Sequence, residues 1–233
     1  MLSVAANPTI SVIIPAFNEE KNIADILAQT EKSLTHLNLS YEVIVINDGS
    51  NDKTKYYASN NGAKLISYLT NHGKGYAIRK GLANARGQIL VTLDADGSHR
   101  PDEIPKLIKP LLLGADVVIG SRFLRAHGKE VTTKLHTLGN LLFNTLILLL
   151  TKKKITDSQT GFRAFKRNTI RDIKLFSNGY EIETELTVKT LKNGFKIREE
   201  PISCDPRKSG RSKLNPLRDG LTILKTILKA HFI

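Results

Sequence analysis

The stretch Ile89-Leu90-Val91-Thr92-Leu93-Asp94-Ala95-Asp96 is an apolar run that ends in two carboxylates one residue apart. A short run of this kind, bounded by Gly87 and Gly97, is typical of a strand buried on both faces of a parallel sheet. Ligands of such sheets bind at the carboxyl ends of the strands. Because residues two apart in an extended chain point the same way, Asp94 and Asp96 are expected to share a divalent cation, Mg²⁺ or Mn²⁺. The alternative is a pair of solvated aspartates that open a turn.

On both sides of this stretch the sequence alternates between predicted strands and predicted helices. Short β-branched or apolar runs predict further strands at 10–14, 42–46, 64–69, 116–119 and 195–202. Helix-spaced apolar residues predict helices over 23–37, 76–84 and 180–191. Alternation of strands with helices of about ten residues predicts an α/β fold with a Rossmann-like, doubly wound and mostly parallel sheet.

An unusually apolar helix is predicted over 134–150, where His136, Asn140 and Asn144 form one polar stripe. At about 17 residues, this helix is short of the roughly 20 that are needed to cross a bilayer. It either lies in the membrane interface or packs in a protein core. The lysines at 152–154 favour the interface, because cationic side chains meet anionic head groups there.

A second amphipathic helix is predicted after Pro216, with leucines on one side and basic residues off it. A cationic helix of this kind is also a candidate membrane-surface element. The composition therefore divides the chain into one catalytic-sized domain, 1–205, which includes the apolar helix, and a basic loop with a C-terminal helix, 206–233.

The composition limits the classes of partner. The 233 residues carry 35 Lys and Arg against 22 Asp and Glu, a net charge of +13, which calls for nucleic acid, an anionic membrane or phosphate-bearing substrates. Nucleic acid is disfavoured because the chain has no Trp and its few aromatic residues are not interleaved with basic ones. The single cysteine, Cys204, excludes an internal disulfide and favours a reducing compartment. No signal peptide is expected at the N-terminus.

Six short motifs follow one another along the chain, at the ends of predicted elements. They are Pro15-Ala16-Phe17-Asn18-Glu19-Glu20, Asn47-Asp48-Gly49-Ser50, Asp94-Ala95-Asp96, Gly120-Ser121-Arg122, Thr160-Gly161-Phe162-Arg163 and the basic loop 207–213. With these motifs the chain resembles family-2 glycosyltransferases with the GT-A fold, of the dolichol-phosphate mannose synthase type. The resemblance spans nearly the whole chain and implies that 1–205 is a GT-A domain.

The resemblance implies a binding site for a nucleotide-sugar donor. Pro15, Phe17 and Glu19 would line the base and ribose pocket, with Ile46 and Asp48 opposite. The other implied donor contacts are Asp94, Ala95, Asp96, Arg122, Arg207 and Lys213.

Two of these motifs, and a further segment at 73–75, allow more than one interpretation. The Asp48-Gly49-Ser50 motif could be a bare Asx turn, and the loop from Arg207 to Lys213 could be a solvated basic tail rather than a lid over the donor. The glycine spacing of Gly73-Lys74-Gly75 fits neither the P-loop nor the dinucleotide-binding fingerprint, so this segment is predicted to be a tight turn. The sequence leaves open whether this turn brings Lys74 near the nucleotide.

The resemblance also implies the catalytic groups. Asp94 and Asp96 would hold the cation, Mg²⁺ or Mn²⁺, that neutralises the donor's diphosphate. In mannose synthases a glutamine two residues after the second aspartate can join the metal site, and here that position is Ser98, a shorter ligand. Besides Asp96, the polar groups expected nearest the reacting centre are Asp157 and Gln159, although Asp157 could equally cap a turn.

The expected function is inverting transfer of mannose or another hexose from a nucleotide-diphosphate sugar to a polyprenyl phosphate, such as dolichyl phosphate. The protein would be peripheral, on the cytosolic face of a membrane, with a small membrane-anchoring subunit as a further partner. The nearest alternative is a transferase that uses a UDP-sugar or another acceptor in glycan or cell-envelope synthesis. A catalytically inactive scaffold is disfavoured because Asp94 and Asp96 are both present.

Overall fold

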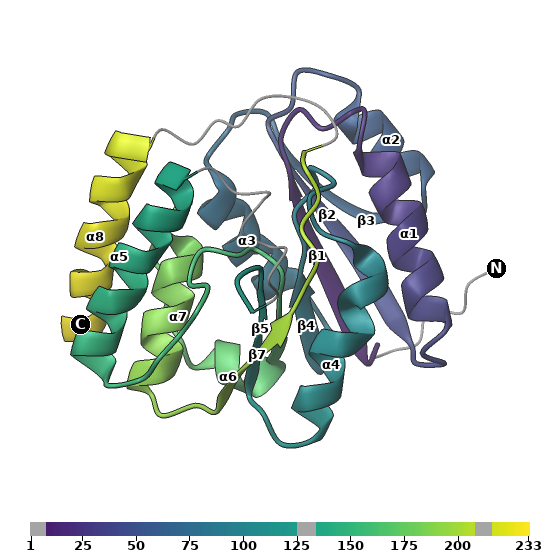
Figure 1. Ribbon diagram of the computed structural model, residues 1–233. Helices are drawn as coiled ribbons and strands as arrows, with labels where there is room; N and C mark the ends of the chain where they lie inside the picture. The colour runs from purple at the N-terminus through teal and green to yellow at the C-terminus, as the bar shows by residue number, and fades with distance from the viewer. Residues whose placement is uncertain (1–7, 125–133, 208–215) are drawn as a thin grey trace.

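The computed structural model describes residues 8–124, 134–207 and 216–233, and these ranges form a sheet covered by helices (Figure 1). The strands are β1 (Ile10–Ala16), β2 (Tyr41–Asp48), β3 (Lys64–Tyr68), β4 (Ile89–Thr92), β5 (Val117–Ser121), β6 (Arg163–Lys166) and β7 (Ile197–Pro201). Their order is β3-β2-β1-β4-β6-β5-β7. Strand β6 runs antiparallel to both of its neighbours, and the other pairings are parallel. The predicted α/β fold with a mostly parallel sheet is therefore confirmed.

Helices cover both faces of this sheet (Figure 1). One face packs against α1 (Ile23–Thr35), α2 (Thr54–Asn60) and α4 (Ile104–Leu112). The other face packs against α3 (Lys74–Asn84), α6 (Arg167–Arg171) and α7 (Ile182–Lys192). Two further helices, α5 (Lys134–Thr151) and α8 (Pro216–Phe232), form an outer layer on α7.

Two element boundaries differ from the sequence prediction in ways that affect the site. Strand β4 ends at Thr92, so Leu93 already belongs to the connection that carries the two aspartates. Helix α3 begins at Lys74, and the predicted tight turn at 73–75 is therefore wrong, because Lys74 and Gly75 lie in the first turn of a helix. Gly81 lets this helix approach the sheet closely, since a Cβ there would fall 2.3 Å from Ile13 Cγ2.

The connections after β1 and β4 leave the sheet at the point where the strand order reverses. From β1 the chain builds outward through β2 to β3, and it then returns to place β4 on the other side of β1. A crevice opens beyond the carboxyl ends of the strands at such a switch point, and this is where ligands of doubly wound sheets bind.

The outer layer turns its polar stripe inward and an apolar face outward. On α5, Asn140 and Asn144 are buried and donate hydrogen bonds from Nδ2 to Thr156 O at 3.0 and 2.8 Å. The exposed large hydrophobic side chains of α5 and α8 are Leu138, Leu141, Leu142, Leu148, Leu149, Leu221, Leu228 and Phe232. The His136 side chain, third of the predicted stripe, lies outside the described part of the structure. In the described ranges, no helix combines the length and the apolar character that crossing a bilayer requires.

Candidate active site

A cavity of ≈ 230 Å³ lies at the switch point, above the carboxyl ends of β1, β2 and β4. Six separate parts of the chain contribute to it. Its lining residues are Pro15, Ala16, Phe17, Glu19, Asp48, Asn71, Gly73, Lys74, Ala77, Asp94, Ala95, Asp96, Gly179, Tyr180 and Arg207. The structure thus brings together most of the residues that the sequence assigns to the donor site.

Asp48 fixes one wall of this cavity. Its carboxylate accepts hydrogen bonds from Asn71 Nδ2 at 3.0 Å, from the backbone N–H of His72 at 3.0 Å and from that of Gly73 at 2.7 Å. These bonds hold the segment that leads into α3, so Asp48 also determines where Lys74 begins the helix. The carboxylate is therefore more than the acceptor of a bare Asx turn, because its donors lie more than 20 residues away in the chain.

The Asp94 carboxylate lies between the Lys74 ammonium group and the Gly161 backbone. Lys74 Nζ lies 2.7 Å from Asp94 Oδ1 and also 2.7 Å from Glu183 Oε1 in the first turn of α7. A Cβ on Gly161 would fall 2.6 Å from Asp94 Oδ2, so only glycine lets this backbone support the carboxylate. Although burial opposes its charge, Asp94 and Glu183 raise the pKa of Lys74 above its usual value. Burial also raises the pKa of Glu183, but we treat Glu183 as ionised because its contact with the ammonium group is direct.

Asp96 is held by a serine and an arginine. Ser98 donates to Asp96 Oδ1 from its hydroxyl at 2.6 Å and from its backbone N–H at 3.0 Å, and Arg207 Nη2 lies 3.0 Å from Asp96 Oδ2. Burial opposes ionisation of Asp96, yet the Ser98 hydrogen bonds, with His99 and Arg207 nearby, lower its pKa to about 2. The same arginine lies 3.5 Å from Glu19 Oε1. Ser98 thus orients Asp96, and its role as a third metal ligand stays a prediction.

The two aspartates fit a hard divalent cation. Mg²⁺ is usually held by one or two carboxylates, with water and substrate phosphates completing its shell, and Mn²⁺ favours the same oxygen donors. Among the described residues there is no cluster of three or more His, Cys, Asp or Glu that would form an all-protein cage. The chain therefore offers the kind of open site that a substrate diphosphate completes, with Asp94 and Asp96 as the protein ligands. Arg207 would have to leave Asp96 Oδ2 for that oxygen to bind a cation.

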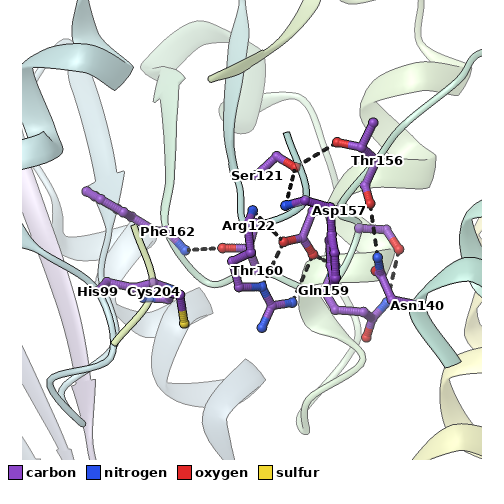
Figure 2. A network of polar contacts seen from close by, with 12 residues as sticks. His99, Ser121, Arg122, Asn140, Thr156, Asp157, Gln159, Thr160, Phe162 and Cys204 are labelled. Atoms are coloured by element: carbon purple, nitrogen blue, oxygen red, sulfur yellow. Dashed lines mark hydrogen bonds and ion pairs between the residues drawn. The ribbon is translucent and has the colours of Figure 1, made fainter. Parts of the chain in front are cut away.

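Arg122 and Asp157 form an ion pair in which the carboxylate is buried and the Arg122 side chain is 20% exposed (Figure 2). Arg122 Nε and Nη2 donate to the two carboxylate oxygens at 2.7 and 2.9 Å, and the Arg122 backbone N–H also donates to Oδ2. Asp157 is 0% exposed. The neighbouring Gln159 donates from Nε2 to Ser158 Oγ and to Thr184 Oγ1. This network connects the end of β5 to the turn that precedes β6.

The network places two of the expected catalytic residues away from the cavity lining. Both carboxylate oxygens of Asp157 accept hydrogen bonds from Arg122, and the Gln159 amide donates to Thr184 on α7. Neither residue lines the cavity, and both position the turn before Gly161. Arg122 is likewise not among the lining residues, because its guanidinium faces Asp157. The predicted place of Ile46 in the nucleoside pocket is wrong, because its side chain is fully buried under α3. Lys213 lies outside the described residues.

Tyr180 and Gly179 line the cavity but were not predicted from the sequence. They precede α7, more than 80 residues after the aspartates, and no local motif marks them. From the sequence alone, it was open whether Lys74 lies near the nucleotide. The sequence signal that could have identified it is Gly73, because a glycine directly before a helix permits the φ of 101° that the structure has there.

Cys204 is expected to be unreactive although it lies close to the site. It pairs through a β-bridge with His99, and burial raises the pKa of its thiol to about 11. Since the thiolate forms only as the pH rises through that value, alkylation by iodoacetamide at pH 8 should be at least about 100-fold slower than for an unperturbed cysteine. Mass spectrometry of the folded and the denatured protein measures this. Equal rates in the two states would contradict the assignment.

With the geometry described, comparisons with known proteins define the class. The family model "Glycosyl transferase family 2" matches residues 11–174, and the chain belongs to this family. It is a glycosyltransferase. The dolichyl-phosphate hexose transferase of Haloferax volcanii is 30% identical over 94% of this chain and 92% of its own length. The dolichol-phosphate mannosyltransferase of Pyrococcus furiosus is 32% identical over 88% of this chain and 59% of its own length.

Solved structures agree with the fold. A glucosyl-3-phosphoglycerate synthase from Mycobacterium tuberculosis, crystallised with Mn²⁺, uridine diphosphate and phosphoglyceric acid, superposes with a TM-score of 0.77 and is 25% identical. The match covers 98% of this chain and 80% of that one. The GT-A fold implied by the sequence motifs is therefore confirmed.

Proposed function

We propose that the protein transfers a hexose, with inversion, from a nucleotide-diphosphate sugar to a polyprenyl phosphate such as dolichyl phosphate. The observation that carries the proposal is the cavity at the switch point, where Asp94 and Asp96 meet the cationic groups of Lys74 and Arg207. Two carboxylates and two cations around one cavity suit a diphosphate bound together with a divalent cation. Relatives named for dolichyl-phosphate acceptors support the choice of acceptor.

The residues of the cavity have separate tasks in this proposal. Phe17 and Glu19 face the nucleoside, and the wall fixed by Asp48 closes its other side. A cation held by Asp94 and Asp96 would supply Lewis-acid stabilisation of the diphosphate leaving group. Arg207 exchanges its contact with Asp96 for the diphosphate oxygens, which an arginine can grip in a bidentate manner.

The acceptor needs positioning more than activation. A phosphate monoester is already ionised near neutral pH, so its oxygen can attack without a general base. The absence of a need for a base agrees with the hydrogen bonds from Arg122 to both oxygens of Asp157, which leave that carboxylate no role as a base. Transfer then depends on excluding water from the donor and on aligning the acceptor phosphate beside it.

The outer layer provides a surface for the membrane that holds such an acceptor. Five leucines of α5 and two of α8 are exposed, whereas Asn140 and Asn144 of α5 are buried, so the outer layer leaves apolar side chains uncovered. Lys152, Lys153 and Lys154 follow α5 and suit anionic head groups. The protein would lie on the cytosolic face of the membrane as a peripheral enzyme, with a small anchoring subunit as a further partner.

A radiolabel assay tests the transfer. The purified protein is incubated with GDP- or UDP-linked radiolabelled hexoses, Mn²⁺ and a polyprenyl phosphate, and the products are extracted into organic solvent. We expect label in the organic phase with at least one donor, and its loss when EDTA removes the metal. Transfer of label to a water-soluble acceptor alone would contradict the lipid acceptor.

A soluble phosphorylated acceptor is the second candidate. The structural likeness to a synthase crystallised with phosphoglyceric acid favours it. Phosphoglyceric acid is therefore included in the same assay as a separate acceptor.

Two leucines test the membrane surface. The double substitution Leu141→Ser and Leu142→Ser on α5 should weaken co-sedimentation with anionic phospholipid vesicles by at least about tenfold, because each leucine contributes roughly 1.5–3 kcal/mol when buried. The matched control is Leu112→Ser with Leu113→Ser, since these leucines are equally exposed but lie at the end of α4. If both double variants bind vesicles like the unmodified protein, α5 is not the contact surface.

A further inference from the structure

Glu183 is a buried carboxylate that the donor site does not explain. It is 2% exposed, lies in the first turn of α7 and does not line the cavity. Among the described residues, the close partner of its carboxylate is Lys74 Nζ, at 2.7 Å. Arg163, the nearest buried guanidinium in this region, is instead occupied by Thr160 O, Ser158 O and Thr187 Oγ1.

The ion pair of Glu183 with Lys74 lies at the cavity, because Lys74 is one of the lining residues. A buried ion pair often stabilises a fold no better than two apolar side chains of the same volume, so stability alone is a weak reason for one. Lys74, however, is not enclosed in the core: it lines the cavity and reaches Asp94 Oδ1 at 2.7 Å. An ammonium group has three donors, and the contacts with Glu183 and Asp94 leave one for a ligand in the cavity.

Charge explains why a second carboxylate is needed behind the lysine. Lys74 alone would cancel half of the negative charge that Asp94 and Asp96 offer to a cation. Glu183 neutralises Lys74, and Glu19 does the same for Arg207 at 3.5 Å. The two aspartates thereby keep the double negative charge that balances a divalent cation.

We propose that Glu183 is a positioning residue of the metal site: it holds Lys74 Nζ against Asp94 Oδ1, and Oδ2 is then the oxygen that would be available to a cation. His99 Nδ1, at 3.9 Å, is too distant to hydrogen-bond to that oxygen. The inference rests on the proposed function, because it takes Asp94 and Asp96 as the cation site. Partners behind metal ligands typically change metal affinity by about 10–100-fold when they are removed.

The test is a Mn²⁺ titration of the whole protein, followed by the EPR signal of free Mn²⁺. In Glu183→Gln the dissociation constant for Mn²⁺ should rise by about 10–100-fold, while kcat at saturating Mn²⁺ stays within about threefold of the unmodified enzyme. The matched control is Glu185→Gln, because Glu185 is equally buried on the same helix but pairs with Lys189 at 2.8 Å. This control should leave the Mn²⁺ affinity unchanged.

The outcomes separate this inference from the proposed function. If Asp96→Asn abolishes Mn²⁺ binding but Glu183→Gln binds Mn²⁺ as tightly as Glu185→Gln, the role of Glu183 is overturned and the metal site stands. If the unmodified protein does not bind Mn²⁺, the metal site and this inference are overturned together. Should Glu183→Gln fail to fold, Glu183→Asp gives the same comparison, since it keeps the charge but shortens the reach to Lys74. A normal affinity in that variant would overturn the inference.

Discussion

Replacing Asp96 by asparagine is expected to lower metal-dependent sugar transfer by at least about 10²–10³-fold while the fold survives. The amide has the shape of the carboxylate but lacks the charge that a divalent cation requires. The Ser98 N–H at 3.0 Å can still donate to the side-chain oxygen, so the local turn should persist. Initial rates of label transfer measure the loss, and circular dichroism measures the fold.

Asp116→Asn is the control for this substitution. Asp116 also pairs with a cation, Lys166 at 3.1 Å, but it precedes β5 at the opposite edge of the sheet from the cavity. We expect a normal transfer rate in this variant. If Asp96→Asn transfers sugar at the rate of Asp116→Asn with ordinary metal concentrations, Asp96 is not a metal ligand.

Replacing Asp157 by asparagine is expected to lower the free energy of unfolding by about 3–5 kcal/mol, because it leaves the Arg122 guanidinium without a counter-charge in a buried site. The carboxylate also accepts hydrogen bonds from the Arg122 backbone and from the Gln159 backbone, and these hold the turn before Gly161. Denaturation in urea measures the change.

The exposed pair of Arg171 and Asp172 provides the control for Asp157. Its two side chains lie 3.3 Å apart on the surface, where water screens the charges, and Asp172→Asn should cost less than about 1 kcal/mol. A loss in Asp157→Asn as small as that in Asp172→Asn would show that the network around Arg122 does not hold the fold together.

The sequence predicted the sheet well because the strands near its centre have clear local signals. The apolar run that becomes β4 and the β-branched run that becomes β1 are buried on both faces, and their ends mark the edge where ligands bind. The motifs after β1, β2 and β4 supplied most of the cavity lining, from Pro15 to Asp96. Local pattern and site coincide there because the strand ends themselves form the site.

The contacts between distant segments could not be predicted in this way. Asp157 looks like a free carboxylate in a polar turn, and only the fold shows that Arg122, 35 residues earlier, occupies both of its oxygens. Glu183 reads as a carboxylate that suits a helix N-terminus, whereas the structure directs it to Lys74, 109 residues away. Such pairs depend on how helices pack on the sheet, which periodicity in the sequence does not specify.

The apolar face of the outer layer was ambiguous for a related reason. The stripe on α5 predicts that one side of the helix differs from the other, but not which side meets the protein. Hydrogen bonds from Asn140 and Asn144 to a single carbonyl, Thr156 O, determine that the polar side is buried. The leucines therefore face outward, where the sequence alone left interface and core as alternatives.

The central claim is that Asp94 and Asp96 hold a divalent cation beside a bound nucleoside diphosphate. The most direct measurement is anomalous diffraction at the Mn absorption edge, from crystals grown with Mn²⁺ and either GDP or UDP. We expect one strong anomalous peak at coordination distance from the Asp94 and Asp96 carboxylates and from the diphosphate, with Arg207 moved off Asp96. A nucleotide bound in the cavity with no anomalous peak at these carboxylates would contradict it.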